Sequence, residues 1–512
     1  MKKLLIVGLA LVLIVIAALA IAVRMLIDPE RVRATIEAQA SVATGMPVTL
    51  QAADISIWPK PRVTLSGLKV GDPASLTLER IEVATALRAL LSRRIENAEL
   101  TLADSTVDVP ALLAALSGIA NESSTPQPPA EGAPIDAPLT LVSVDTIAFR
   151  NVRVIYNGGS AAVNFESALS GDRLDIRSFN LASEVTDLEA SGAIESLAGR
   201  RGKLTISADS LDLDGMIAVL SGMQGAQGAP PQGAQGGEAV DMTFDVTAAK
   251  GRAGGVQFDN LKAMIHATAG GVQMEPFGFG AFDGRVDGKA RVDTSRAEPA
   301  LVLDAKLSQL DVAAVAAFVG QPGAITGRLG GELHLSGAGA DPTAALANAS
   351  GTGALAITDG VIPNLHLVRA IVIAFGKPEP GSTGGGDRFT RISTTVDLAK
   401  SMLRFSTITF ASPDVDVDGS GTLNLSAGVV DITGRARLSE ALTAQAGRDL
   451  VRYTSDANRV TVPVTVSGAV DAPQVRVDAG ALLRRAAENE VKSQIQKRTG
   501  GLLDRLKGKK KP

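Results

Sequence analysis

The segments Leu76-Thr77-Leu78-Glu79 and Ile81-Glu82-Val83 alternate apolar and polar side chains. Such alternation is typical of a β-strand with one apolar and one polar face, because successive side chains point to opposite sides. The alternation recurs at Val48–Gln51, Asp54–Ile57, Val63–Ser66, Leu100–Leu102 and Val107–Val109. Further strand patterns lie at Val152–Tyr156, Leu204–Ser207, Met242–Val246, Leu301–Leu303, Leu333–Leu335 and Leu355–Ile357. Runs at about the 8–12-residue spacing seen here, separated by Gly, Asn or Asp, are typical of antiparallel all-β proteins. The sequence therefore predicts a mostly β chain.

Size and composition narrow the class of protein further. The chain has 512 residues, which predicts several cores or one extended repetitive structure. Its 50 Lys and Arg against 54 Asp and Glu offer no basic face for a nucleic acid. Apolar residues make up 45% of the chain but aromatics only 3%, so Ala, Val, Leu and Ile dominate. Cysteine is absent, which excludes disulfides, thiolate metal sites and cysteine nucleophiles.

An uncharged apolar run extends from Leu4 to Val23, between Lys2–Lys3 and Arg24. At about 1.5 Å per helical residue it reaches about 30 Å, the thickness of a bilayer core. The alternative is a cleaved signal peptide, but the apolar part of such a peptide is usually only about 7–15 residues long. We predict a retained transmembrane anchor bounded by Leu4 and Val23, with everything after Ile27 on one side of the membrane.

A few helices and three low-complexity segments interrupt the strands. Helical patterns lie at Pro29–Val42, Ala86–Leu91, Ile362–Phe375 and Ala479–Leu506. Residues 117–138 are rich in Pro, Ser and Glu, residues 224–237 in Gly, Gln and Pro, and residues 377–387 in Gly and Pro. These compositions predict loops or linkers.

Residues that could carry bond chemistry are scattered. His266, His334 and His366 lie in unrelated segments without a partner at motif spacing. Asp414–Gly419 matches the opening of a calcium loop, but Leu425 replaces the required glutamate, so a strand with exposed carboxylates is the better interpretation. Gly199–Lys203 and Gly278–Gly280 are interpreted as turns. We expect no catalytic, cofactor-binding or metal-ligating residues.

Trp58, followed by Pro59, allows two interpretations. It could anchor the chain at a membrane interface, or fill a small core, and packing is the more common role for a single tryptophan.

Sheets with one apolar face also allow two architectures. The sheet can fold on itself into sandwiches with dry cores. It can instead curl into an open trough whose apolar inside holds an aliphatic ligand. A composition dominated by Ala, Val, Leu and Ile fits both.

Motifs near both ends resemble the AsmA family of bacterial envelope proteins. After the apolar run these are Ile27–Val32, Ala43–Leu50, Ile55–Pro59, Val63–Gly71 and Ala86–Ile95; toward the other end they are Arg388–Ile392, Leu423–Leu425, Val462–Gly468 and Ala472–Val475. From about Ser117 to Gly270 the similarity is weak. The insert at 224–237 departs from the family pattern.

The resemblance implies an inner-membrane anchor, a periplasmic body and a long β-groove related to bridge-like lipid-transfer proteins. It favours an open groove formed by an extended antiparallel sheet, with a carboxy-terminal amphipathic helix. It also implies a role in outer-membrane assembly, with membrane phospholipids as partners moved passively and no enzymatic step. The alternative is a structural or adhesive envelope protein without a lipid ligand.

The predicted organisation follows from these patterns. It comprises an anchor (1–27), an amino-terminal β region (28–116), a linker (117–138), a middle β-groove region (139–376) with its insert at 224–237, a loop (377–387), a carboxy-terminal β region (388–477), and an amphipathic helix with a basic tail (478–512).

Overall fold

The computed structural model describes residues 29–478, apart from 87–93, 112–139, 216–239, 375–386, 446–454 and gaps of one to four residues elsewhere. These residues form two compact units, 1–269 and 270–512, which are described separately. The predicted anchor (4–23), the helical patterns at 86–91 and 479–506, and most of the low-complexity residues lie outside the described residues.

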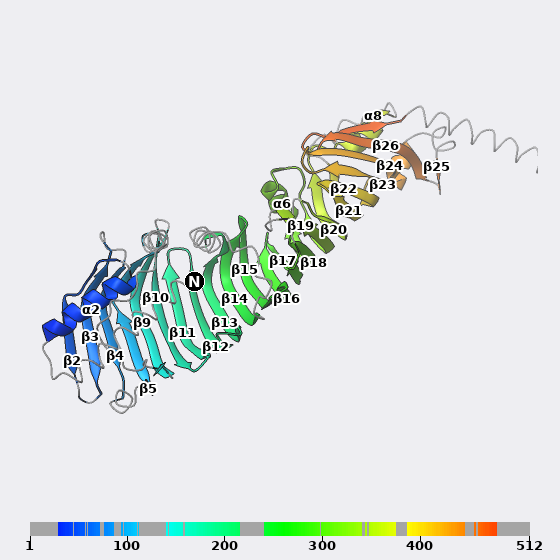
Figure 1. The fold of residues 1–512 in the computed structure, drawn as a ribbon. Helices are drawn as coiled ribbons and strands as arrows, with labels where there is room; N and C mark the ends of the chain where they lie inside the picture. Colours follow the sequence, from blue (N-terminus) through cyan, green and yellow to red (C-terminus); the bar gives the residue numbers. More distant parts are fainter. Residues whose placement is uncertain are drawn as a thin grey trace, which may run out of the picture. The chain divides into compact units, whose positions relative to one another are not determined.

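Among its described residues, the first unit has one helix, a long sheet and a separate two-stranded sheet (Figure 1). Its elements are α2 (Pro29–Thr44), β1 (Val48–Thr49), β2 (Ala52–Ser56), β3 (Arg62–Val70), β4 (Leu76–Ala84), β5 (Arg94–Ile95), β6 (Ala98–Ala103), β7 (Thr106–Asp108), β8 (Thr140–Leu141), β9 (Ser143–Tyr156), β10 (Gly159–Ser170), β11 (Arg173–Ser183), β12 (Asp187–Ser196), β13 (Arg201–Asp212), β14 (Asp241–Ala253) and β15 (Val256–Thr268). Strands β1 and β2 pair with β3 at one edge, followed by β4, by β6 and β7, and then by β9 to β15 in chain order.

This sheet is mixed rather than wholly antiparallel as the resemblance implied. Strands β6 and β7 pair with β9 in parallel, and β13 pairs with β14 in parallel. Parallel neighbours need a crossover of a dozen residues or more, since the chain must return to the starting end. The connections at 109–142 and 213–240 supply that length, and each contains a low-complexity segment. The segments at 117–138 and 224–237 therefore lie inside crossovers of one sheet.

In the part of the second unit that the structure describes, an antiparallel sheet carries three helices. Its elements are β16 (Gly271–Ala281), β17 (Gly284–Asp293), β18 (Ala300–Asp311), α6 (Val312–Phe318), β19 (Arg328–Ala338), β20 (Ser350–Ile362), α8 (Leu367–Ala374), β21 (Asp387–Ala399), β22 (Met402–Ala411), β23 (Val415–Asn424), β24 (Val429–Leu438), α9 (Glu440–Gln445), β25 (Ser455–Asp456), β26 (Arg459–Ala469) and β27 (Gln474–Val477). Each strand pairs with the next along the chain, except that β24 pairs with β26, and the short β25 pairs with β26.

The register of this pairing keeps apolar and polar side chains on separate faces. Leu303 of β18 lies opposite Ala290 of β17 and Leu335 of β19. The next residue, Asp304, lies opposite Lys289 and His334. Because side chains alternate along each strand, this register builds an apolar face and a polar face across neighbouring strands.

Each unit has one closed core, where a helix covers the apolar face. In the N-terminal core, Ile36 and Ala40 of α2 pack with buried residues of the first strands, namely Val48, Leu50, Ala53, Val63, Leu65, Leu68, Val70, Leu78, Ile81, Val83, Ala98 and Val144. In the C-terminal core, Leu367 and Ile371 of α8 pack with Leu365, Phe389, Phe410, Val415, Val417, Ala436, Leu438, Val460, Val462 and Val464.

Most of the predicted elements are confirmed. Every alternating run named above lies within or overlaps a strand, and α2 begins at Pro29 as expected. The helical spacing from Ile362 begins too early, because Ile362 still belongs to β20 and α8 starts at Leu367. The interpretation of Gly278–Gly280 as a turn is wrong, since these residues lie inside β16 and pair with β17.

Candidate functional site: the open apolar face

Between the closed core and the opposite edge of each sheet, many apolar side chains on this face are only half-buried. They alternate with buried neighbours on the same face, namely Leu188, Ala208 and Val246 in the first unit and Phe277, Ala305 and Leu310 in the second. We call these half-buried residues the open face. In the first unit they are Phe149, Val163, Phe165, Leu174, Ile176, Phe179, Leu181, Ile194, Leu204, Ile206, Phe244 and Ile265. In the second unit they are Met274, Phe279, Val286, Ala290, Val292, Leu301, Leu303, Leu307, Leu329, Leu333, Leu335 and Leu355.

Cross-strand pairs make the open face of the first unit continuous with its closed core. Phe149 lies opposite Leu102 of β6 on one side and Phe165 of β10 on the other. The ring centroids of Phe149 and Phe165 are 5.4 Å apart, and those of Phe165 and Phe179 are 6.3 Å apart. Beyond this aromatic ladder the face is mostly aliphatic.

The second unit has the same arrangement with fewer rings. Leu329 on the open face lies opposite Ile357, which pairs with Ile392, and both isoleucines pack against the C-terminal core. In the closed core, buried side chains such as Val415 are 0% exposed. Leu303, three strands farther from that core than β21, keeps part of its surface exposed. The covered and open stretches are thus parts of one apolar surface.

The polar face carries paired charges. Asp304 lies 2.7 Å from the ring of His334 and 3.9 Å from Lys289, and Arg285 lies 2.7 Å from Asp287. Side chains on this face are exposed to solvent, where such pairs contribute little to stability. These charged pairs do keep the polar face hydrated and distinguish it chemically from the open face.

An apolar surface of this kind suits acyl chains. Exposing a methylene group to water costs about 0.8 kcal/mol, so a chain of roughly fourteen carbons would cost on the order of 10 kcal/mol. Aliphatic side chains that remain partly exposed can remove most of that cost by covering the chain. A polar headgroup can stay at the rim of the sheet, in contact with water.

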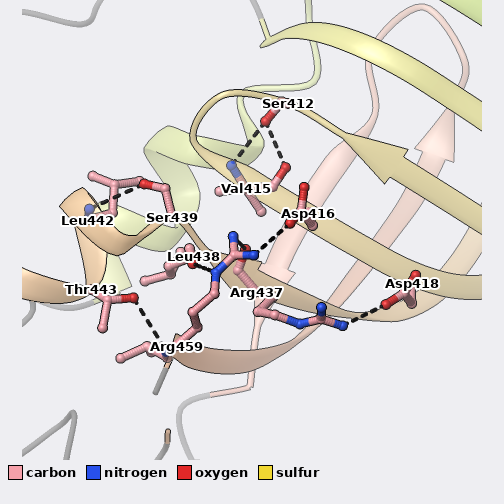
Figure 2. Close-up of polar contacts among 11 residues, drawn as sticks. Ser412, Val415, Asp416, Asp418, Arg437, Leu438, Ser439, Leu442, Thr443 and Arg459 are labelled. Carbon is pink, nitrogen blue, oxygen red and sulfur yellow. Dashed lines mark hydrogen bonds and ion pairs between the residues drawn. The ribbon is translucent and has the colours of Figure 1, made fainter. Parts of the chain in front are cut away.

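The calcium-like segment Asp414–Gly419 lies on β23 and the turn before it. Asp416 forms an ion pair with Arg459 at 2.8 Å, and Asp418 forms one with Arg437 at 3.0 Å (Figure 2). The strand interpretation is confirmed. Asp416 and Asp418 lie across from arginines of β24, whereas the valines lie across from Leu438 and Ala436 on the other face of the strand. Among the described residues, no group of three or more His, Asp or Glu could hold a metal ion.

His266 and His334 each contact an aspartate. His266 lies 2.7 Å from Asp241 in the first unit, whereas His334 contacts Asp304 in the second. His366 lies in the turn before α8 with a φ of 50°. Each of the first two has an ordinary exposed carboxylate partner.

Two expectations about single residues are wrong. Trp58 is 86% exposed, so it fills no core. Val415 and Val417, expected to face a lipid if the sheet is an open groove, are 0% and 8% exposed beneath α8. Sequence alternation identified their face but not the helix that covers it.

A model of the AsmA family matches residues 1–168 and 178–432. The chain belongs to the AsmA family. Within this AsmA-family chain, the match includes most of residues 117–270, where the motifs noted above are weak, and it ends before those at Val462–Gly468 and Ala472–Val475. It covers almost all of the open face. No curated protein and no solved structure matches the chain.

The anchor predicted between Leu4 and Val23 falls within the family match but outside the described residues. Among the helices that the structure describes, none is both long and apolar enough to cross a bilayer.

Proposed function

We propose that this chain is an inner-membrane-anchored protein of the bacterial envelope, with its body in the periplasm. It supports outer-membrane assembly by carrying phospholipid along the open face. Acyl chains lie on the apolar side chains while headgroups remain in water at the rim. Lipid moves down its own gradient, and no residue makes or breaks a bond.

The observation that carries this proposal is the partial exposure of apolar side chains that are held in register across many strands. A packed sandwich would bury such a face against a second sheet. The described side chains of the open face instead stay half-buried, whereas the two closed cores lie where α2 and α8 pack on the same face. Family membership supports an envelope role.

Bound lipid is the direct test. The full chain is purified, extracted with organic solvent and analysed for phospholipid by mass spectrometry. The paired variants are Leu303→Asp on the open face and Val302→Asp on the polar face, one residue apart on β18. Val302 is already 44% exposed, so it controls for the added charge.

We expect wild type and Val302→Asp to carry phospholipid, and Leu303→Asp to carry several-fold less while keeping its β-sheet circular dichroism. Transfer of fluorescent phospholipid between donor and acceptor vesicles should fall in the same variant. Wild type with no phospholipid above the background of an unrelated membrane protein would favour the structural or adhesive alternative.

A further inference from the structure

Trp58 follows the edge strand β2 and is 86% exposed. The hydroxyl of Ser56 donates a hydrogen bond of 3.1 Å to the backbone oxygen of Trp58. This contact holds the backbone of the turn but leaves the ring in solvent. Tryptophan is the largest side chain and is highly buried on average, so this exposed indole is a candidate for an external contact when its position supports one.

Helix α2 places the amino-terminal end of the unit on the same side as this turn. The backbone N–H of Val48 donates to Ser41 Oγ at 3.0 Å, and that of Leu50 donates to Glu37 Oε1 at 2.8 Å. The residue number rises from Val48 to Leu50 while that of the helix partner falls from Ser41 to Glu37. Helix α2 therefore runs antiparallel to the segment leading into β2. The first residue of α2, Pro29, therefore lies toward the end of β2 that carries Trp58.

The predicted anchor (4–23) precedes α2 in the sequence by five residues, so a bilayer that held it would lie near this end of the helix. Tryptophan is enriched at membrane–water interfaces, where its apolar ring and its N–H group suit the headgroup region. Exposure and position thus indicate the same partner, a bilayer surface.

Charges beside Trp58 are already compensated. Lys60 lies 2.6 Å from Glu99, and Arg62 lies 3.3 Å from Glu82. The hydrogen bond and charge of Glu99 raise the pKa of Lys60. A contact made here depends on the indole ring rather than on free positive charge.

We propose that Trp58 inserts into the headgroup region of the bilayer that holds the predicted anchor. This contact rests on the proposed anchor but not on lipid transfer. It gives the first unit a second attachment point and holds the α2 end of its sheet against the membrane surface.

Trp58 is the sole tryptophan of the chain, so intrinsic fluorescence reports on it alone. The full chain is reconstituted into phosphatidylcholine vesicles, with or without phosphatidylglycerol. Relative to the urea-unfolded chain, we expect emission at shorter wavelength, several-fold weaker quenching by acrylamide, and quenching by phosphatidylcholine brominated near the headgroup. Equal results in both vesicle types are expected, because the neighbouring charges are paired.

The matched control moves the reporter to the other ends of the strands. Val185 is 53% exposed in the turn between β11 and β12. The directions of the strands place this turn at the other end of the sheet's strands from the turn that carries Trp58. In the double variant Trp58→Phe, Val185→Trp, the indole should remain fully open to acrylamide. Equal shielding at both positions would overturn the proposal, because it would indicate a general effect of reconstitution.

Three further results would also overturn it, and they separate its failure from that of the anchor. If acrylamide quenches Trp58 fully while the chain stays in the membrane after carbonate washing, the anchor is supported and the contact of Trp58 with the bilayer is contradicted. If carbonate washing releases the chain from the membrane, both the anchor and the contact of Trp58 with the bilayer are contradicted. Shielding from acrylamide without quenching by brominated lipid would indicate a protein partner at Trp58 instead.

Discussion

The Asp387 carboxylate accepts a hydrogen bond from the backbone N–H of Leu367, 20 residues earlier in the chain. Its other oxygen accepts from the N–H of Val368 at 3.4 Å. Asp387 is the first residue of β21, yet it satisfies donors in the first turn of α8. This buried side chain fastens the helix that covers the C-terminal core to the sheet beneath it.

Asp387→Ala should loosen α8. Loss of a capping acceptor costs about 1 kcal/mol, within a range of about 0.5–2. A loss of about 1–2 kcal/mol corresponds to a factor of roughly 5 to 30, so hydrogen exchange of the α8 amides should accelerate by that factor. Asp387→Asn is the control, because its amide oxygen can still accept the hydrogen bonds. Unchanged exchange in Asp387→Ala would show that the cap does not hold the helix.

The same residue predicts a pH dependence. Burial raises the pKa of Asp387, and the hydrogen bonds from Leu367 and Val368 oppose that rise. Because the pKa is higher in the folded state than in the unfolded state, the folded state takes up the proton first as the pH falls. The contribution of Asp387 to stability therefore increases as the pH drops through its folded pKa toward the unfolded value.

Denaturant unfolding of wild type and Asp387→Asn at a series of pH values measures this contribution as a difference. Wild type should gain stability relative to Asp387→Asn as the pH is lowered through that window, and the difference should level off above it. Parallel pH profiles for the two proteins would contradict the prediction.

Val417→Asp should disrupt the C-terminal core. Its side chain is 8% exposed and packed beneath α8, so an unpaired carboxylate there costs several kcal/mol. We expect loss of cooperative thermal unfolding or a large fall in expression. The control is Asp418→Asn on the polar face, which removes an exposed ion pair with Arg437 and should cost less than about 1 kcal/mol. A stable, cooperatively unfolding Val417→Asp protein would mean that α8 does not seal this core.

Gly331 and Gly330 should respond oppositely to alanine. Gly331 has a φ of 144°, and a Cβ atom there would collide with the backbone oxygen of Ala354 on β20. We expect Gly331→Ala to lose about 1–3 kcal/mol through backbone strain. At Gly330 the nearest atom to a new Cβ is Leu307 O at 3.5 Å, so Gly330→Ala should be neutral or stabilise by up to about 1 kcal/mol. Denaturant midpoints of the two variants test this order, and equal midpoints would contradict it.

Limited proteolysis should cut first in the low-complexity segments at 224–237 and 377–387. Their composition offers too little apolar area to offset the entropy lost on ordering. A protease of broad specificity and low concentration, followed by mass spectrometry of the fragments, locates the cuts. First cuts inside β22, β23 or β24 would show that the paired strands open more readily than these segments.

Much of the fold could be predicted from local sequence. The alternation at Leu76–Val83 or Leu333–Leu335 identified strands and their apolar side, because side-chain direction along a strand has a fixed period of two. Proline at position 29 fixed the start of α2 for a similarly local reason. Motifs toward both ends predicted the family, and the family model confirms it.

The sequence by itself determined which residues share a face, and only the tertiary structure decided which part of that face is covered. Val415–Val417 and Leu333–Leu335 both alternate, yet α8 covers the valines while Leu333 stays half-buried. Packing between elements distant in the chain leaves no periodic signal in either segment. The tertiary structure likewise decided that β13 pairs with β14 in parallel and that Trp58 is exposed. A local pattern specifies the direction of a side chain along a strand, but not which distant segment packs against it.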